Sequence, residues 1–247
     1  MIVQAEPRMW LALGLGVAAA AGNLFGGLFV VYRSWPRRSL TYFLALGAGF
    51  MLAASLLEMV PESLHLLGDS AMLLIVAGYF LVHFFEHTLA PHFHFGEETH
   101  ADEVRHRHAS LSALGGLGIH SFFDGVAIAS GFLISDWLGA VVFLAIILHK
   151  LPEGFTVSSL LLAGGRSRQS ALLGAALLGA ATVAGVILMT LLHTAVAYTL
   201  PLSAGVTLYV AASDLIPEVN REPGTRIAIL VFLGAALVLL LQKLFHF

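Results

Sequence analysis

Two apolar segments of the chain each carry a histidine four residues before an acid. His120 and Asp124 lie in LGIHSFFDGVAIASG, and His149 and Glu153 lie in IILHKLPEGFTVSS. Residues i and i+4 share one face of a helix, so each segment presents an imidazole beside a carboxylate. Two such helices facing each other would offer two nitrogens and two carboxylates, a sufficient ligand set for a divalent transition metal.

The same four side chains have a structural alternative, in which buried histidine–carboxylate hydrogen bonds hold the helices together. Ionisable groups inside apolar segments are costly and usually face a bundle interior or a pathway. Pro152 removes a backbone hydrogen bond and frees the carbonyl of Leu148 inside the second segment. Lys150 is a cation that needs a counter-charge there. We expect Ser121 and Lys150 to lie beside the metal ligands or on the pathway to them.

These segments belong to a chain that is too apolar for a soluble domain. Of its 247 residues, 58% are hydrophobic and 11% are charged, and its mean hydropathy is +0.90. Charged residues make up about 25% of an ordinary soluble domain. The apolar runs are long and unbroken, unlike the short alternating strands of a membrane β-barrel. Cysteine is absent, which excludes disulfide bonds and thiolate ligands. The composition therefore predicts an all-α polytopic membrane protein.

Eight runs are long enough to span a bilayer, which requires roughly 20 apolar residues. They cover Met9–Tyr32, Leu40–Leu64, Ala71–Leu89, Ala109–Phe132, Trp137–Leu162, Gln169–Thr194, Leu200–Val219 and Thr225–Phe245. We predict eight transmembrane helices that form a single transmembrane domain over residues 1–247. We expect the first run to be a retained helix and not a cleaved signal.

The longest polar connection covers residues 91–109 and is rich in histidine. Such a tract is a candidate for weak transition-metal binding, with a plain solvated loop as the alternative. Its histidines are His92, His94, His100, His106 and His108.

The arginines predict how the chain is oriented. They gather in the loops that follow the first, third, fifth and seventh runs, whereas the opposite side holds only Arg8 and Lys243. Cytoplasmic loops carry an excess of Lys and Arg. We therefore expect both termini outside and the 91–109 loop in the cytoplasm. The membrane we expect is a bacterial inner (plasma) membrane.

One sequence pattern occurs twice, in helices that run in opposite directions. Glu58 and Glu62 in the second run, and Asp214 and Glu218 in the seventh, both read acid-x-x-Pro-Glu. Inverted repeats of this kind are typical of transporters. The predicted arrangement is three helices, a central pair, then three helices. The four acids are candidate gate residues that raise the local cation concentration, with ordinary helix-end charges as the alternative. Met51 is a candidate soft ligand on the pathway, with packing as the alternative.

These motifs resemble the ZIP (Zrt/Irt-like protein) family of divalent metal transporters. HSFFDG, which starts at His120, looks like the fourth-helix motif of the family, and HKLPEG, which starts at His149, looks like the fifth. ALGAGFMLAASLLEMVPE and LYVAASDLIPEV look like its second and seventh helices. The likeness covers most of the chain. It implies uptake of Zn²⁺ or a related ion toward the cytoplasm, with His120, Asp124, His149 and Glu153 as transport-site ligands. It also implies an elevator-like movement of the central bundle.

Two positions depart from the family pattern. Some members hold two metals, with acids at the positions that match Lys150 and, by a looser alignment, Thr182. Because a lysine and a threonine stand there in this chain, we expect one metal. Asp124 stands where many relatives have glutamate, and the shorter carboxylate is expected to affect geometry and selectivity.

The sequence thus predicts alternating access around a mid-membrane His/carboxylate site. An intramembrane metal-dependent hydrolase is the alternative, but catalytic zinc keeps an open position. Four candidate ligands and the lack of a His-Glu-x-x-His motif favour transport. Zn²⁺ is the expected substrate, and Cd²⁺, Fe²⁺, Mn²⁺ and Co²⁺ suit the same ligands. The expected partners are these ions and the lipid bilayer, with a homodimer as a possible assembly and no nucleic acid.

Overall fold

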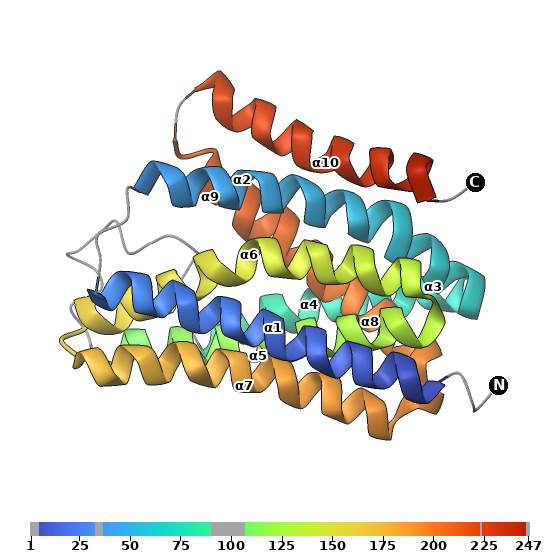
Figure 1. The fold of residues 1–247 in the computed structure, drawn as a ribbon, viewed down its shortest axis with the longest axis horizontal. Helices are drawn as coiled ribbons and strands as arrows, with labels where there is room; N and C mark the ends of the chain where they lie inside the picture. The colour runs from blue at the N-terminus through green and yellow to red at the C-terminus, as the bar shows by residue number, and fades with distance from the viewer. Residues whose placement is uncertain (1–4, 33–36, 90–106, 223, 246–247) are drawn as a thin grey trace.

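The structure is a computed structural model that describes residues 5–32, 37–89, 107–222 and 224–245. Within these ranges the chain is helical and forms no strand. The helices lie along the long axis of the molecule, and α1 begins at the same end at which α10 finishes (Figure 1). In chain order the elements are α1 (Ala5–Tyr32), α2 (Arg37–Ala54), the π-helical segment η2 (Ser55–Met59), α3 (Val60–Leu67), α4 (Ser70–Leu89), α5 (Arg107–Ile134), α6 (Asp136–Ala163), α7 (Arg168–Leu191), the 3₁₀ turn η4 (His193–Ala195), α8 (Val196–Tyr209), the π-helical segment η5 (Val210–Leu215), α9 (Ile216–Val219) and α10 (Thr225–Phe245).

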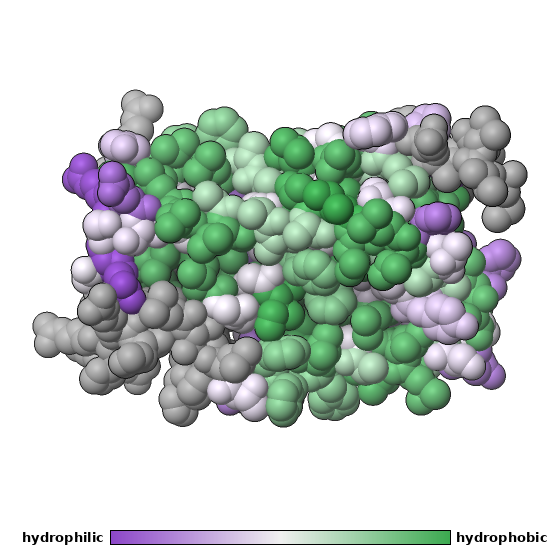
Figure 2. Space-filling view, turned by 90° about the horizontal axis from the view of Figure 1, so that it is seen from below, coloured by the Kyte–Doolittle hydropathy of each residue, from purple (hydrophilic) through white to green (hydrophobic). Residues whose placement is uncertain are grey.

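The eight predicted spans are confirmed. By length and composition, eight helical stretches of the described residues are able to cross a membrane. The second stretch, Ser39–Leu67, joins α2, η2 and α3, and the seventh, His193–Val219, joins η4, α8, η5 and α9. On the face that Figure 2 shows, apolar side chains cover the middle, and hydrophilic ones gather toward the two ends. The chain is therefore an integral membrane protein.

Both acid-x-x-Pro-Glu motifs interrupt a helix in the same way. Glu58 lies in the π-helical segment η2, and Pro61 follows in the first turn of α3; Asp214 lies in η5, and Pro217 follows in the first turn of α9. Proline has no N–H to donate, so the backbone cannot keep its regular hydrogen bonds immediately before it. Single π turns of this kind are frequent at functional sites.

Four pairs of helices approach so closely that a glycine on each touches the backbone of the other. A Cβ atom on Gly49 of α2 would collide with the carbonyl oxygen of Val231 on α10, and one on Gly234 of α10 would collide with that of Leu46. Small residues permit such close packing in membranes. The same reciprocal contact joins three other glycine pairs: Gly78 with Gly205 (α4–α8), Gly26 with Gly154 (α1–α6) and Gly125 with Gly185 (α5–α7).

The helices fall into two packing groups. Helices α1, α5, α6 and α7 each pack against the other three. In the second group α2 packs against α10, α4 packs against α8, and α2 also contacts α8 and η5. The groups meet where α2 contacts α6 and where α5 contacts α4 and α8. The contacts thus do not confirm the predicted arrangement of three helices, a central pair and three helices, because α1 and α7 pack with the central pair.

The glycine contacts support the predicted inverted repeat. Gly49 and Gly205 are 156 residues apart, as are Gly78 and Gly234, and the same offset separates the two acid-x-x-Pro-Glu motifs. The offset relates Gly49 of α2 to Gly205 of α8 and Gly78 of α4 to Gly234 of α10, so the α2–α10 contact corresponds to the α8–α4 contact. Helices α1 and α7 run in opposite directions (Figure 1). The offset therefore supports a repeat in which α2 and α4 correspond to α8 and α10.

Candidate metal centre

Four ionisable side chains from α5 and α6 meet inside the bundle. His120 and Asp124 lie one turn apart on α5, and His149 and Glu153 lie one turn apart on α6. Each is at most 3% exposed, and one ligand atom from each lies within 4.8 Å of the others. The described residues hold no second group of three or more such ligands at this spacing. The two helix faces that the sequence predicted to meet do meet.

The nitrogen and oxygen atoms converge on one point. Nε2 of His120 lies 3.3 Å from Nε2 of His149 and 3.2 Å from Oδ2 of Asp124, and Nε2 of His149 lies 3.3 Å from the same oxygen. Nδ1 of His149 donates to the carbonyl of Ala145 at 2.9 Å, so Nε2 of the neutral ring carries a lone pair. This lone pair faces a carboxylate oxygen, which is also an acceptor. A cation between them would bind both, so the donor set fits a divalent metal.

Two buried atoms of the cluster have no hydrogen-bond partner among the described residues. They are Nδ1 of His120 and Oδ1 of Asp124. Buried polar atoms are normally paired, and an exception calls for an explanation such as an absent ion or water. Asp124 therefore has an oxygen available in addition to the one that both histidines already face.

Lys150 occupies one side of the cluster. Its Nζ lies 2.7 Å from Oδ2 of Asp124 and 2.5 Å from Oε2 of Glu153, and it donates to Oγ of Ser121 at 3.0 Å. The side chain is completely buried, where an unpaired ammonium would be very unfavourable. With neutral histidines, the lysine leaves one uncompensated negative charge in the cluster. One divalent cation overcompensates that charge, and a second would meet strong repulsion.

Two polar neighbours orient Glu153. The hydroxyl of Ser121 donates to Oε1 of Glu153 at 2.5 Å. From α1, the side-chain amide of Asn23 faces two acceptors, so its nitrogen is assigned to that side. In this orientation it donates to the carbonyl oxygen of Lys150 at 2.6 Å and to Oε2 of Glu153 at 3.2 Å. Asn23 is completely buried. Sequence reasoning missed it, although an asparagine inside the apolar run of α1 was a usable signal.

The carbonyl that Pro152 frees lies against a neighbouring helix. Pro152 is buried inside α6. A Cβ atom on Gly47 of α2 would lie 3.5 Å from the carbonyl oxygen of Leu148. This carbonyl therefore packs at the boundary between the two helix groups, which is one of the outcomes tolerated inside a membrane.

The candidate gate acids of the second span lie outside the cluster. Glu58 is partly buried, and its Oε2 accepts a hydrogen bond from Nε1 of Trp137 at 3.0 Å. Trp137 lies in the first turn of α6, so this bond joins the two helix groups. Glu62 lies 3.9 Å from Nδ1 of His65, one turn on. Sequence reasoning did not single out Trp137.

The corresponding acids of the seventh span also lie outside it. Asp214 is 6% exposed. Glu218 lies 3.3 Å from Arg221. Met51 is completely buried in an apolar cluster with residues such as Ala48.

The predicted loop site falls outside the described residues. This applies to His92, His94, His100 and His106, whereas the backbone of His108 already belongs to α5. Thr182 is one of the two positions at which the sequence departs from the family pattern. It is buried, and its hydroxyl donates to the carbonyl of Leu178 at 3.3 Å.

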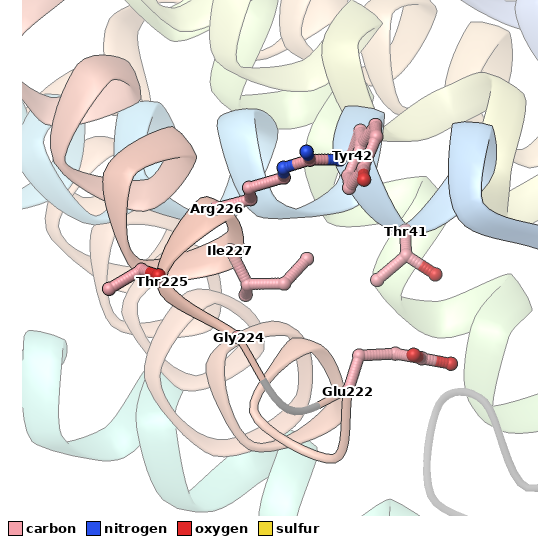
Figure 3. Close-up of a pocket in the computed structure, with 7 residues that line it drawn as sticks. All are labelled: Thr41, Tyr42, Glu222, Gly224, Thr225, Arg226 and Ile227. Carbon is pink, nitrogen blue, oxygen red and sulfur yellow. The ribbon is translucent and has the colours of Figure 1, made fainter.

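A surface pocket lies apart from the cluster, between the start of α2 and the connection from α9 to α10 (Figure 3). It contains none of the four candidate ligands. Its lining residues are Thr41, Tyr42, Glu222, Gly224, Thr225, Arg226 and Ile227.

Comparison with known proteins gives one consistent result. A profile of the family described as ZIP zinc transporter matches residues 96–242. The chain is 33% identical to the zinc transporter ZIP10 of Danio rerio over 107 residues, which are 42% of this chain and 13% of that protein. It is 31% identical to the zinc transporter ZIP13 of Pongo abelii over 130 residues, 49% of this chain and 40% of that protein. It is 31% identical to the metal cation symporter ZIP14 of Mus musculus over 106 residues, 42% of this chain and 22% of that protein. The chain thus spans less than half the length of these relatives.

Proposed function

The chain belongs to the ZIP family of zinc transporters, and on this premise we propose that it carries Zn²⁺ across the membrane toward the cytoplasm. Cd²⁺, Fe²⁺, Mn²⁺ and Co²⁺ suit imidazole and carboxylate ligands to differing degrees and are further candidate substrates. Members of the family are transporters and not enzymes, so the alternative of a metal-dependent hydrolase is set aside.

The observation that carries the proposal is the buried cluster itself. In the proposed mechanism His120, Asp124, His149 and Glu153 bind the metal. Nε2 of His149 and Oδ2 of Asp124 supply electron pairs that face each other at 3.3 Å. Glu153 exchanges its bond to Lys150 for a bond to the metal, and Lys150 keeps Asp124 and Glu153 near one another while the site is empty.

Alternating access requires the cluster to open toward one side at a time. The division of helices into two packing groups supports a movement of one group relative to the other. The cluster lies wholly on α5 and α6, in the group that also contains α1 and α7. We propose that this group moves and that the acids of the two acid-x-x-Pro-Glu motifs attract cations at opposite ends. Both termini then lie outside the cytoplasm, and residues 91–109 lie within it.

The remaining expectations also belong to this proposal. We propose that residues 1–247 act as one transmembrane domain, that the membrane is a bacterial inner membrane, and that the chain assembles as a homodimer. The mass of the purified protein, corrected for bound detergent, tests the assembly.

Metal flux into proteoliposomes tests the function. Purified protein is reconstituted with a zinc-sensitive dye inside, and His149→Ala is compared with the native chain. Removing one of four ligands is expected to reduce initial uptake at least tenfold, since it removes an interaction worth about 1.4 kcal/mol or more.

His193→Ala is the matched control, because His193 is exposed in the 3₁₀ turn η4 and lies outside the cluster. Its uptake is expected to equal that of the native chain. Native uptake by a folded His149→Ala protein would remove the site assignment, and no uptake by the native protein would remove the transport proposal.

A further inference from the structure

Hydrogen bonds cross the boundary between the two helix groups near the end at which α5 turns into α6. In one of them, Nε1 of Trp137 in the first turn of α6 donates to Oε2 of Glu58 in η2 at 3.0 Å. In another, Oγ of Ser130 on α5 lies 3.2 Å from Oγ1 of Thr199 on α8. Ser130 is four residues from the end of α5, and Thr199 is three residues from the start of α8.

A third hydrogen bond connects the two partners of these bonds within the second group. Oγ of Ser55 in η2 donates to the carbonyl oxygen of Ala204 in α8 at 3.1 Å, and both residues are completely buried. The contacts therefore form a closed circuit from α6 to η2, from η2 to α8 and from α8 to α5, and the turn at Ser135 leads from α5 back to α6. We call this circuit the polar ring; its members are Ser55, Glu58, Ser130, Trp137, Thr199 and the carbonyl of Ala204.

The turn that carries Trp137 is held in place by α1. Nε of Arg8 lies 2.9 Å from Oδ1 of Asp136, and Nη1 of Arg8 donates to the carbonyl of Ile134 at 3.4 Å. Figure 1 shows the start of α1 at the same end of the molecule as α3, which follows η2. The first group thus presents Trp137 to Glu58 from a turn that is fixed on two sides.

A buried hydroxyl without a partner lies behind the polar ring. Thr199 and Ser203 are four residues apart and share one face of α8, so Ser203 lies one turn further along the face that meets α5. It is completely buried, and its Oγ has no hydrogen-bond partner among the described residues. On α5, the candidate ligand Asp124 is six residues before Ser130. The polar ring therefore lies between the metal cluster and this end of the bundle.

We propose that the polar ring is a latch, which closes the boundary between the helix groups at this end and opens it when the bonds of Trp137 and Ser130 break. Groups that separate there can bond to water, so the net free energy of each broken bond is small and opening is reversible. Ser203 then gains the water partner that it lacks in the closed state. That this end is the outer one, and that opening admits metal, rests on the proposed function; the closure itself does not.

Thiol labelling of the full-length protein tests the latch. The native chain contains no cysteine, so one introduced cysteine is the only reactive thiol. Ser203→Cys nearly keeps the side-chain size and removes no hydrogen bond among the described residues. A water-soluble thiol reagent is expected to react slowly with this protein. Adding Trp137→Phe and Ser130→Ala is expected to accelerate the reaction about tenfold or more, because a hydrogen bond to a carboxylate is among the stronger ones.

The matched control adds Trp10→Phe and Ser170→Ala to Ser203→Cys. These are the same replacements, at a tryptophan that is 72% exposed and at a serine whose hydroxyl pairs with Ser167 before the start of α7. The labelling rate is expected to stay that of Ser203→Cys alone, and circular dichroism checks that each protein is folded. Equal labelling rates in the latch variant and the control would overturn the proposal. So would a reaction of Ser203→Cys alone that is as fast as in the unfolded chain.

A cross-link across the same contact gives a second test. Ser130→Cys and Thr199→Cys together replace two oxygens 3.2 Å apart by sulfur atoms, which a disulfide holds at about 2 Å. The oxidised protein is expected to lose zinc uptake into proteoliposomes, and reduction is expected to restore it. Native uptake by the cross-linked protein would overturn the latch. Absence of uptake by the native protein would instead remove the proposed function, and the labelling rates would still decide on the latch.

Discussion

Each carboxylate of the metal cluster divides its oxygens between the candidate metal and polar neighbours. Glu153 accepts hydrogen bonds from Ser121, Asn23 and Lys150, and Asp124 contacts Lys150 and both histidines. The cluster is therefore a network in which every side chain has at least one partner before a metal arrives. Such second-layer contacts fix ligand orientation and usually affect metal affinity strongly.

We propose that Lys150 limits how many metals the cluster holds. We expect the native protein to bind one divalent ion at the site, because the Nζ of Lys150 already lies between Asp124 and Glu153. Lys150→Asp replaces a cation by a carboxylate and is expected to admit a second ion. Metal content at saturation, measured by elemental analysis with and without the substitution, checks both numbers. Two ions in the native cluster, or a single ion in the folded variant, would contradict this assignment.

Asn23 contributes to the cluster from a third helix. Asn23→Ala removes the hydrogen bonds to Glu153 and to the Lys150 carbonyl, and we expect metal affinity to fall about tenfold or more, as for other partners of metal ligands. Calorimetric titration of the purified protein with Zn²⁺ measures the change. Asn220→Ala, at an exposed position after α9, is the control and should retain native affinity. Native affinity in folded Asn23→Ala would show that Glu153 needs no support from α1.

At the scale of elements, the close glycine contacts set the distances between helices. They occur in reciprocal pairs, so each helix pair is held at backbone contact from both sides. The π-helical segments then carry Glu58 and Asp214 at equivalent places of the two repeats. Each π-helical segment ends next to the proline of its motif. Proline breaks the regular hydrogen-bond pattern of the helix there, which accounts for the π turn at both places.

Gly49→Ala tests the helix contacts away from the metal cluster. The added methyl group would collide with the carbonyl oxygen of Val231, and overpacking of this kind costs about 1–3 kcal/mol. Thermal unfolding in detergent is expected at a lower temperature. Gly14→Ala in α1 is the control, since a Cβ there meets nothing within 4 Å, and it should unfold at or above the native temperature. Equal unfolding temperatures of native and Gly49→Ala proteins would mean that α2 and α10 can move apart freely.

At the scale of the whole molecule, the boundary between the two helix groups is where relative movement must occur. The boundary is largely apolar, and Gly47 of α2 lies against the backbone of Leu148. The hydrogen bond from Trp137 to Glu58 is a polar contact across it. Oε1 of Glu58 is already buried without a hydrogen-bond partner among the described residues. Breaking the bond from Trp137 would leave Oε2 without this partner as well, which costs free energy.

Trp137→Phe is expected to loosen the boundary. Hydrogen bonds to charged groups contribute about 1.5–3 kcal/mol, so amide exchange in η2 should accelerate roughly tenfold or more. Hydrogen–deuterium exchange with mass spectrometry measures residues 55–59 directly. Trp10→Phe makes the same replacement at a 72% exposed position and should leave exchange in η2 unchanged. Native exchange rates in Trp137→Phe would show that this bond does not hold the groups together.

The sequence by itself determined the elements and which candidate ligands share a helix face. Eight apolar runs predicted eight spans because a bilayer demands about 20 apolar residues in each, and the structure places a helix on every one. The i, i+4 spacing put His120 beside Asp124 and His149 beside Glu153, because helical periodicity is a local property. The repeated acid-x-x-Pro-Glu motif was likewise visible in the sequence alone.

Only the tertiary structure decided how the helices group and which atoms touch. Order along the chain suggested a central pair between two sets of three, but packing depends on surfaces that meet in space, and α1 and α7 join the pair. The contacts of Asn23 with Glu153 and of Trp137 with Glu58 each join residues on different helices. No local pattern encodes such contacts, because helix rotation and crossing are set by side-chain packing between segments distant in sequence.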